Sequence, residues 1–238
     1  MVEEKKVYKS FQEIPPRDYM YFPKGVIEAD KPGRFSKTEI VHLLISIAVL
    51  TLAFSFVLPK NNIFYRGINL DINSLISFLP ISFLAVLTAF FFHEISHKFM
   101  AQRYGLWSEF RMYPFGLLLA LILAFFTPLI FAAPGAVMFR GDSRNFENGK
   151  IATAGPLANL IVAFITLPLY FIFFESTLGQ ILGLICLINA FLATFNLLPL
   201  GTLDGAKIVR WNATIWIILL SIAIAIMAYV MINISFAL

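Results

Sequence analysis

The stretch Phe91–Lys98, "FFHEISHK", decides the fold, because it places ionisable side chains at the end of the apolar run Leu75–Phe92. A charged side chain at the centre of a bilayer costs at least about 2.5–3.5 kcal/mol, and less near its edge. Such residues therefore persist in membrane segments mainly where function or pairing offsets that cost. We expect this stretch to carry a functional site that the rest of the chain holds in place.

The composition is that of an integral membrane protein. The chain has 238 residues, of which 59% are hydrophobic and 13% charged, and its mean hydropathy is +0.82. Continuous apolar runs of about 20 residues predict spanning helices and not barrel strands. We therefore expect an all-α polytopic membrane protein with about five transmembrane helices and a re-entrant hairpin. The apolar runs are Ile40–Leu58, Leu75–Phe92, Phe115–Phe131, Ile151–Phe174, Leu178–Pro199 and Ala213–Phe236.

Two regions are expected from the polarity of the chain: a polar, cytosolic N-terminal tail over residues 1–39 and a membrane-embedded domain over residues 40–238. The net charge of +4 does not indicate nucleic-acid binding, because the basic residues flank membrane segments and form no dense tract. The lone cysteine, Cys186, excludes an intramolecular disulfide and a cysteine zinc cluster.

The HExxH string within the opening stretch predicts a metal site. In a helix, His93 and His97 lie one turn apart on the same face, so both imidazoles can bind one ion. Glu94 lies beside them and can take a proton from an attacking water, as in zinc hydrolases. The alternative is structural, with packing histidines and a surface pair between Glu94 and Lys98.

A catalytic zinc usually has three protein ligands, so one more is required. Asp204 is the best candidate, because it lies where Pro199, Gly201 and Gly205 interrupt the sequence "FNLLPLGTLDGAKIVRWN". The helix should unwind there, which is tolerated at membrane depth only against protein or a water-filled cavity. Asp204 could instead cap the helix that resumes near Ala206, and both roles can hold at once.

Three motifs in this order resemble the site-2 protease family of intramembrane zinc metalloproteases, which cut the transmembrane helices of other proteins. They are "HEISH", "GPLAN" (Gly155–Asn159) and "NLLPLGTLDG" (Asn196–Gly205), within a three-helix core over about residues 75–210. The resemblance implies one zinc ion per chain.

The same resemblance assigns roles to single residues. His93, His97 and Asp204 would be the zinc ligands and Glu94 the general base. Asn196 would lie near the site and hold the substrate or the oxyanion. The extended segment "APGAVMF", which contains Gly135, would bind substrate as an added strand, and Asn159 of the second motif is a further candidate contact for substrate or oxyanion.

Lysine and arginine positions test the topology independently. If every apolar run crosses the membrane, these residues divide evenly between the two sides, and Asp204 and His97 face opposite sides. If Phe115–Phe139 enters and returns, nearly all basic residues share the side of the N-terminus, together with both motifs. Pro128, Pro134 and Gly135 suit such a broken hairpin. The positive-inside rule therefore predicts a multi-pass protein of the cell membrane whose N-terminus and site open to the cytosol.

The sequence thus predicts an intramembrane zinc endopeptidase in the lipid bilayer, with a transmembrane protein as substrate. We expect water to enter near Lys98, Arg103 and Lys207. One alternative is a membrane metal-binding or transport protein in which the same residues hold an ion in transit. Another is a catalytically silent scaffold, which the intact Glu94 disfavours.

Overall fold

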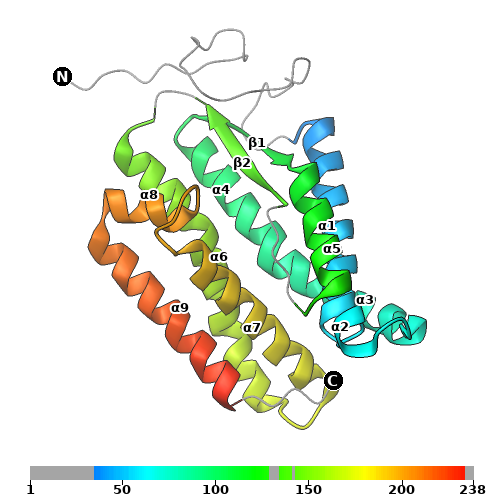
Figure 1. Ribbon diagram of the computed structural model, residues 1–238. Helices are drawn as coiled ribbons and strands as arrows, with labels where there is room; N and C mark the ends of the chain where they lie inside the picture. Colours follow the sequence, from blue (N-terminus) through cyan, green and yellow to red (C-terminus); the bar gives the residue numbers. More distant parts are fainter. Residues whose placement is uncertain (1–34, 129–133, 141–142, 234–238) are drawn as a thin grey trace, which may run out of the picture.

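A computed structural model describes residues 35–128, 134–140 and 143–233, and five of its helices are long and apolar enough to cross a membrane. The chain is an all-α polytopic membrane protein with one short β-ribbon (Figure 1). The spans are α1 (Lys37–Val57), a continuous helix formed by α3 (Ile72–Val86), η2 (Leu87–Phe91) and α4 (Phe92–Arg103), α6 (Asn145–Ile172), α7 (Thr177–Asn196) and α9 (Ala213–Asn233). The shorter elements are α2 (Ile63–Arg66), β1 (Trp107–Met112), α5 (Pro114–Phe126), β2 (Gly135–Arg140) and α8 (Asp204–Trp211).

The first helix begins earlier than the sequence predicts. Ser36 caps α1 by accepting a hydrogen bond from the Glu39 N–H over 3.1 Å, so residues 37–39 are helical. Of the tail expected over residues 1–39, residues 1–34 lie outside the described residues. Glu39 is completely buried.

The helix with the HExxH motif contains a π-helical turn, η2, which ends two residues before His93. A π-turn admits one extra residue and shifts the faces that follow it, and such turns are frequent at functional sites. The apolar run ends at Phe92, but the helix continues to Arg103. The HExxH motif therefore lies within the helix and not at its end.

The apolar insert between α4 and α6 enters and returns at the same end of the molecule. The helix α5 has 13 residues and is about 20 Å long, well short of the roughly 30 Å of a hydrocarbon core. At its start the Tyr113 N–H donates to Pro134 O, and Met112 pairs with Gly135 in the antiparallel ribbon. At its far end Thr127 O accepts from Asn62, beyond the end of α1. The two described ends of the insert thus lie side by side at the ribbon, as a re-entrant insert requires.

A non-helical segment separates α7 from α8, as the proline and glycines predict. Gly201 has a φ of +52°, a conformation that favours glycine. Gly205 lies so close to the end of α7 that a Cβ there would overlap Leu197 O. This sharp turn brings Asp204, at the start of α8, back against the bundle.

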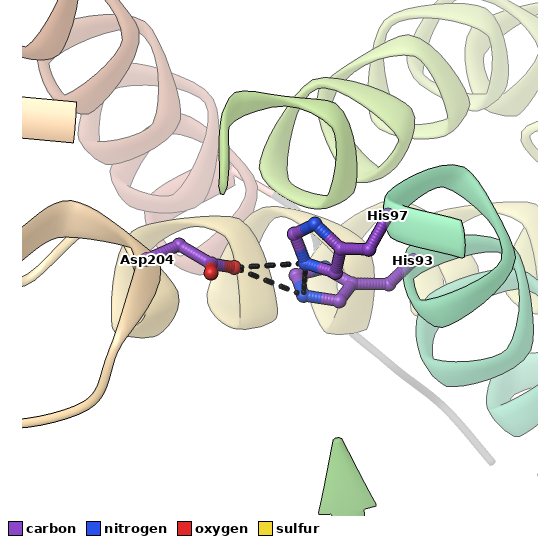
Figure 2. A group of neighbouring side chains, drawn as sticks. All are labelled: His93, His97 and Asp204. Atoms are coloured by element: carbon purple, nitrogen blue, oxygen red, sulfur yellow. Dashed lines mark hydrogen bonds and ion pairs between the residues drawn. The ribbon is translucent and has the colours of Figure 1, made fainter. Parts of the chain in front are cut away.

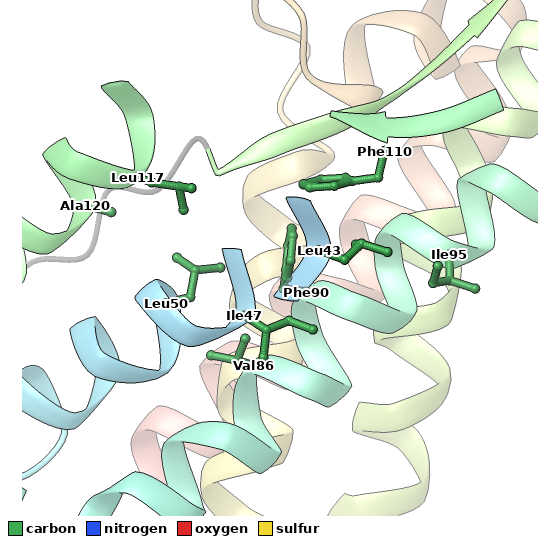
Figure 3. Close-up of a cluster of buried hydrophobic side chains, with 9 residues drawn as sticks. All are labelled: Leu43, Ile47, Leu50, Val86, Phe90, Ile95, Phe110, Leu117 and Ala120. Carbon is green, nitrogen blue, oxygen red and sulfur yellow. The ribbon is translucent and has the colours of Figure 1, made fainter. Parts of the chain in front are cut away.

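An apolar cluster anchors the β-ribbon to the helices that surround the site. Phe110 of β1 points down onto Phe90, with ring centroids 5.5 Å apart in an edge-to-face arrangement (Figure 3). The cluster joins α1, the motif helix, β1 and α5, and its buried members are Leu43, Ile47, Leu50, Val86, Phe90, Ile95, Phe110, Leu117 and Ala120. The ribbon is therefore part of the packed core and not a surface hairpin.

The two ends of the bundle differ in charge. Lys60 and Arg66 follow α1, at the end where α3 begins, whereas the other basic residues of the described part lie on the ribbon, on α8 and at the ribbon-side ends of the helices (Figure 1). This distribution agrees with the re-entrant topology and predicts that the ribbon end faces the cytosol.

Single cysteines in a Cys186→Ser background test this topology. Cysteines at positions 103 and 144 flank the insert, and we expect an impermeant thiol reagent to label both from the side opposite to a cysteine at position 60. The measurement is labelling in sealed vesicles of known orientation. Labelling of positions 103 and 144 from opposite sides would show that the insert crosses the membrane.

Candidate metal centre

Three donor atoms from two distant segments meet inside the bundle. The helix α4 presents His93 and His97, and α8 presents Asp204 as its first residue (Figure 2). The two Nε2 atoms are 3.0 Å apart, and Asp204 Oδ2 lies 3.0 Å from His97 Nε2 and 3.4 Å from His93 Nε2. All three side chains are buried, so their surroundings decide their protonation.

The Nδ1 side of each imidazole faces an acceptor. His93 Nδ1 lies 2.6 Å from Asn159 Oδ1, and His97 Nδ1 lies 2.7 Å from the carbonyl oxygen of Ile151. A carbonyl oxygen only accepts, so the proton of each neutral ring belongs on Nδ1 and the lone pair on Nε2. Both lone pairs therefore point toward Asp204.

The orientation of the Asn159 amide is fixed independently. Its Nδ2 donates to Ala89 O over 2.8 Å and to Asn189 Oδ1 over 3.0 Å, so its oxygen must be the atom that faces His93. Asn159 is completely buried. It orients a candidate metal ligand, as an outer-shell partner does in many metal sites.

This donor set fits a zinc ion. Without a cation, two imidazole lone pairs and a carboxylate would repel one another in a buried space. Ligands about 2.0–2.1 Å from a tetrahedral zinc lie about 3.3 Å from one another, close to the three separations observed here. Two histidines and one carboxylate leave a fourth position open for water or substrate, as in catalytic zinc sites.

Gly155 provides the space that the donors need. A Cβ at this position would overlap His97 Nε2 and lie 2.6 Å from His93 Nε2. The first residue of the "GPLAN" motif thus lies against the metal-binding atoms, and the last, Asn159, holds one of the rings. Ile151, on the same helix, holds the other ring through its backbone.

Glu94 lies beside the candidate metal ligands and is held by the β-ribbon. Its Oε2 accepts a hydrogen bond from the Val137 N–H of β2 over 3.0 Å. The side chain is buried, with 8% of the residue exposed. The carboxylate is therefore aimed by a strand that lies outside the HExxH helix.

Asp204 is better placed to be a metal ligand than a helix cap, because both of its carboxylate oxygens contact residues at the site. Leu203 occupies the N-cap position of α8, and no side chain caps that helix. Oδ2 faces the two histidines, and Oδ1 accepts from Lys207 Nζ over 3.2 Å. With no cation bound, burial raises the pKa of Asp204, but positive charge on His97 and His93 and their hydrogen bonds to the carboxylate outweigh burial and hold that pKa well below its usual range. A bound cation would supply the positive charge to neutral rings instead, so Asp204 would be ionised as a metal ligand must be.

The remaining predicted site residues lie outside the donor set. Asn196 is the last residue of α7 and donates to Leu192 O of its own helix, so its contact with substrate stays a prediction. Gly135 begins β2 with a φ of +151° and packs so tightly on β1 that a Cβ would overlap Arg111 O. Asn159 was expected to contact substrate or oxyanion, but its complete burial behind His93 gives it the positioning role instead.

The prediction that water enters near Lys98 is wrong. Lys98 is completely buried and binds Glu39 of α1, which also removes the alternative of a surface pair with Glu94. The sequence carried a signal for this, since a lysine one turn after Glu94 within a membrane helix needs a partner. The contributions of Ile151 O and the Val137 N–H are backbone contacts that residue types do not reveal.

A membrane helix bundle with a buried site of two histidines and one aspartate defines a membrane metalloprotein. Two curated proteins are similar to it: "Putative zinc metalloprotease MJ0611" of Methanocaldococcus jannaschii, 42% identical over 83% of this chain and 97% of that protein, and "Putative zinc metalloprotease YwhC" of Bacillus subtilis, 29% identical over 57% of this chain and 70% of that protein. No family model and no solved structure matches the chain. By its similarity to the archaeal protein, the chain belongs to this family of zinc metalloproteases.

Gly155→Ala should abolish metal binding, because the added methyl group would occupy the space between the two Nε2 atoms. The measurement is the zinc content of the purified protein. The matched control is Thr153→Ala on the same helix. Its hydroxyl donates to Gly149 O one turn back, so this variant should keep full zinc content. Normal zinc content in Gly155→Ala would contradict the placement of the ion.

Asp204→Asn should weaken zinc binding by at least about 100-fold, the upper end of what loss of an outer-shell partner costs. The amide keeps the size of the side chain but loses its negative charge. Because the two imidazoles are neutral, the third ligand has to supply that charge. Competition with a chelator of known affinity measures the change. Unchanged affinity would reduce Asp204 to a structural residue at the start of α8.

Proposed function

We propose that this protein is an intramembrane zinc endopeptidase of the site-2 protease type, which hydrolyses peptide bonds within or near transmembrane segments of other membrane proteins. The observation that carries the proposal is the buried set of His93, His97 and Asp204, assembled among membrane helices with Glu94 beside it. We infer one zinc ion per chain, because one such set is found in the described residues.

Zinc bound by these residues would acidify water and polarise the carbonyl to be attacked. Glu94 is placed to act as the general base. Its Oε2 is occupied by the Val137 N–H, which leaves Oε1 to take the proton of the attacking water. The same oxygen then passes the proton to the leaving amine, which completes hydrolysis.

A helical substrate must unwind before its peptide bond can be attacked, and β2 offers a partner for the unwound chain. The Val137 N–H points out of the ribbon toward Glu94, so this edge of β2 faces the catalytic residues. An extended segment that adds to a sheet edge gains backbone hydrogen bonds, which offset those lost on unwinding. A transmembrane segment of another protein, reached through the lipid bilayer, is the substrate class that suits this arrangement.

The proposed orientation brings the site close to the cytosol. The ribbon, the end of α4 and α8 lie at the basic end of the bundle, which the positive-inside rule assigns to the cytosol. Lys207, whose side chain is 44% exposed while it contacts Asp204, connects the site with that side. We infer that water enters along this path, past α8.

Glu94→Gln separates this proposal from metal transport. The variant should bind as much zinc as the wild type, because Glu94 is not a ligand, yet cleave a transmembrane substrate at least about 100-fold more slowly, since it lacks the base. Zinc content and the rate of cleavage in liposomes are the two measurements. Equal cleavage rates would exclude Glu94 as the base. A transporter would instead move zinc across the vesicle membrane and cut nothing.

A further inference from the structure

A completely buried ion pair lies next to the metal centre and has no part in the chemistry described so far. Lys98 Nζ of α4 contacts Glu39 Oε1 at 2.9 Å and Oε2 at 2.7 Å, and neither residue has any exposed surface. The two residues join the first spanning helix to the helix that carries the HExxH motif. Burial of two charges is expensive, and a buried ion pair by itself is weak evidence for added stability.

Both members of the pair also bind the outer edge of β1. Glu39 Oε1 accepts the Phe110 N–H over 2.9 Å, and Lys98 Nζ donates to Ser108 O over 3.0 Å. The Ser108 hydroxyl donates back to Lys98 O over 3.2 Å, and the Phe35 ring lies 4.7 Å from the ammonium group. The ion pair is therefore a clamp on the backbone of β1.

The opposite edge of the ribbon, formed by β2, is bound at the residue that pairs with Phe110. Phe110 and Val137 are partners in the antiparallel register, and their N–H groups point away from each other. Glu39 accepts one of these N–H groups and Glu94 accepts the other. A single cross-strand pair thus lies between two carboxylates, one from α1 and the proposed base from α4.

We propose that Glu39 and Lys98 are positioning residues, which fix the β1–β2 ribbon relative to Glu94 and to the metal ligands. This inference rests on the proposed function, because the ribbon is the proposed substrate strand and Glu94 the proposed base. Lys98 directly follows His97, so one helix holds the metal through His93 and His97 and the ribbon through Glu94 and Lys98. Loss of the clamp should let the ribbon shift while the metal site stays intact.

A purely structural role predicts a different result. Removal of one partner of a buried pair leaves an unpaired charge and destabilises the protein strongly, whereas apolar replacement of both is often neutral. If the pair only stabilises the fold, a double apolar variant that restores stability must also restore activity. If it positions the ribbon, stability returns and activity does not.

The test is the full-length double variant Glu39→Met/Lys98→Met in liposomes, compared with the wild type. We expect normal zinc content and a thermal midpoint above that of either single methionine variant, but below the wild type because the Phe110 N–H and Ser108 O lose their partners. The kcat should fall about 10–100-fold, the effect expected when a reacting group is misplaced by about 1 Å. Backbone amide exchange at residues 135–140 should become faster. The matched control, Lys60→Met/Glu175→Met, removes the same two charges at the opposite end and should change none of these values.

An unchanged kcat in a stable, zinc-loaded double variant would overturn the proposal. If that variant does not fold, Glu39→Asp decides, because it keeps both charges of the pair and shortens only the reach to the Phe110 N–H. Positioning predicts a lower kcat at normal zinc content, and an unchanged kcat would overturn the proposal. A wild-type protein that cuts no transmembrane substrate would refute the proposed function instead, whatever these variants do.

Discussion

The structure depends on holding three acceptor atoms 3.0–3.4 Å apart inside an apolar bundle. Such an arrangement is repulsive unless a cation lies between the atoms and the rings cannot turn away. Asn159 and Ile151 prevent that rotation by binding the far side of each imidazole, and Gly155 keeps the central space free of side chain. All three lie on α6, which is therefore the support of the site although it supplies no metal ligand.

The topology follows from the same requirement. His97 and Asp204 can share an ion only if α4 and α8 approach the site at the same depth, which the insert achieves by returning the chain to the end from which it entered. The turn after Asn196 then reverses the chain so that a carboxylate points inward. A proline and two glycines suffice for this turn, because they remove the hydrogen bonds and torsional limits that would extend α7.

Much of this could be predicted from the sequence, because the signals are local. The i,i+4 spacing of His93 and His97, the break before Asp204 and the distribution of charge each need only neighbouring residues. The contacts that escaped prediction join distant positions through the backbone or through buried charge, such as Val137 with Glu94 and Glu39 with Lys98, 59 positions apart. The strand β1 was missed for the same reason, since its partner becomes visible only once the insert is folded.

The motif helix has two neighbouring faces with different tasks. His93 and His97 share one face, and Glu94 and Lys98, each one residue later, share the next. Because a helix is rigid over one turn, the distance between the metal ligands and the ribbon is set within α4 itself. Only Glu39 of α1 and Asp204 of α8 then depend on how the other helices pack, which membrane thickness can alter. The HExxH segment and the lysine that follows it thus position both the metal site and the ribbon.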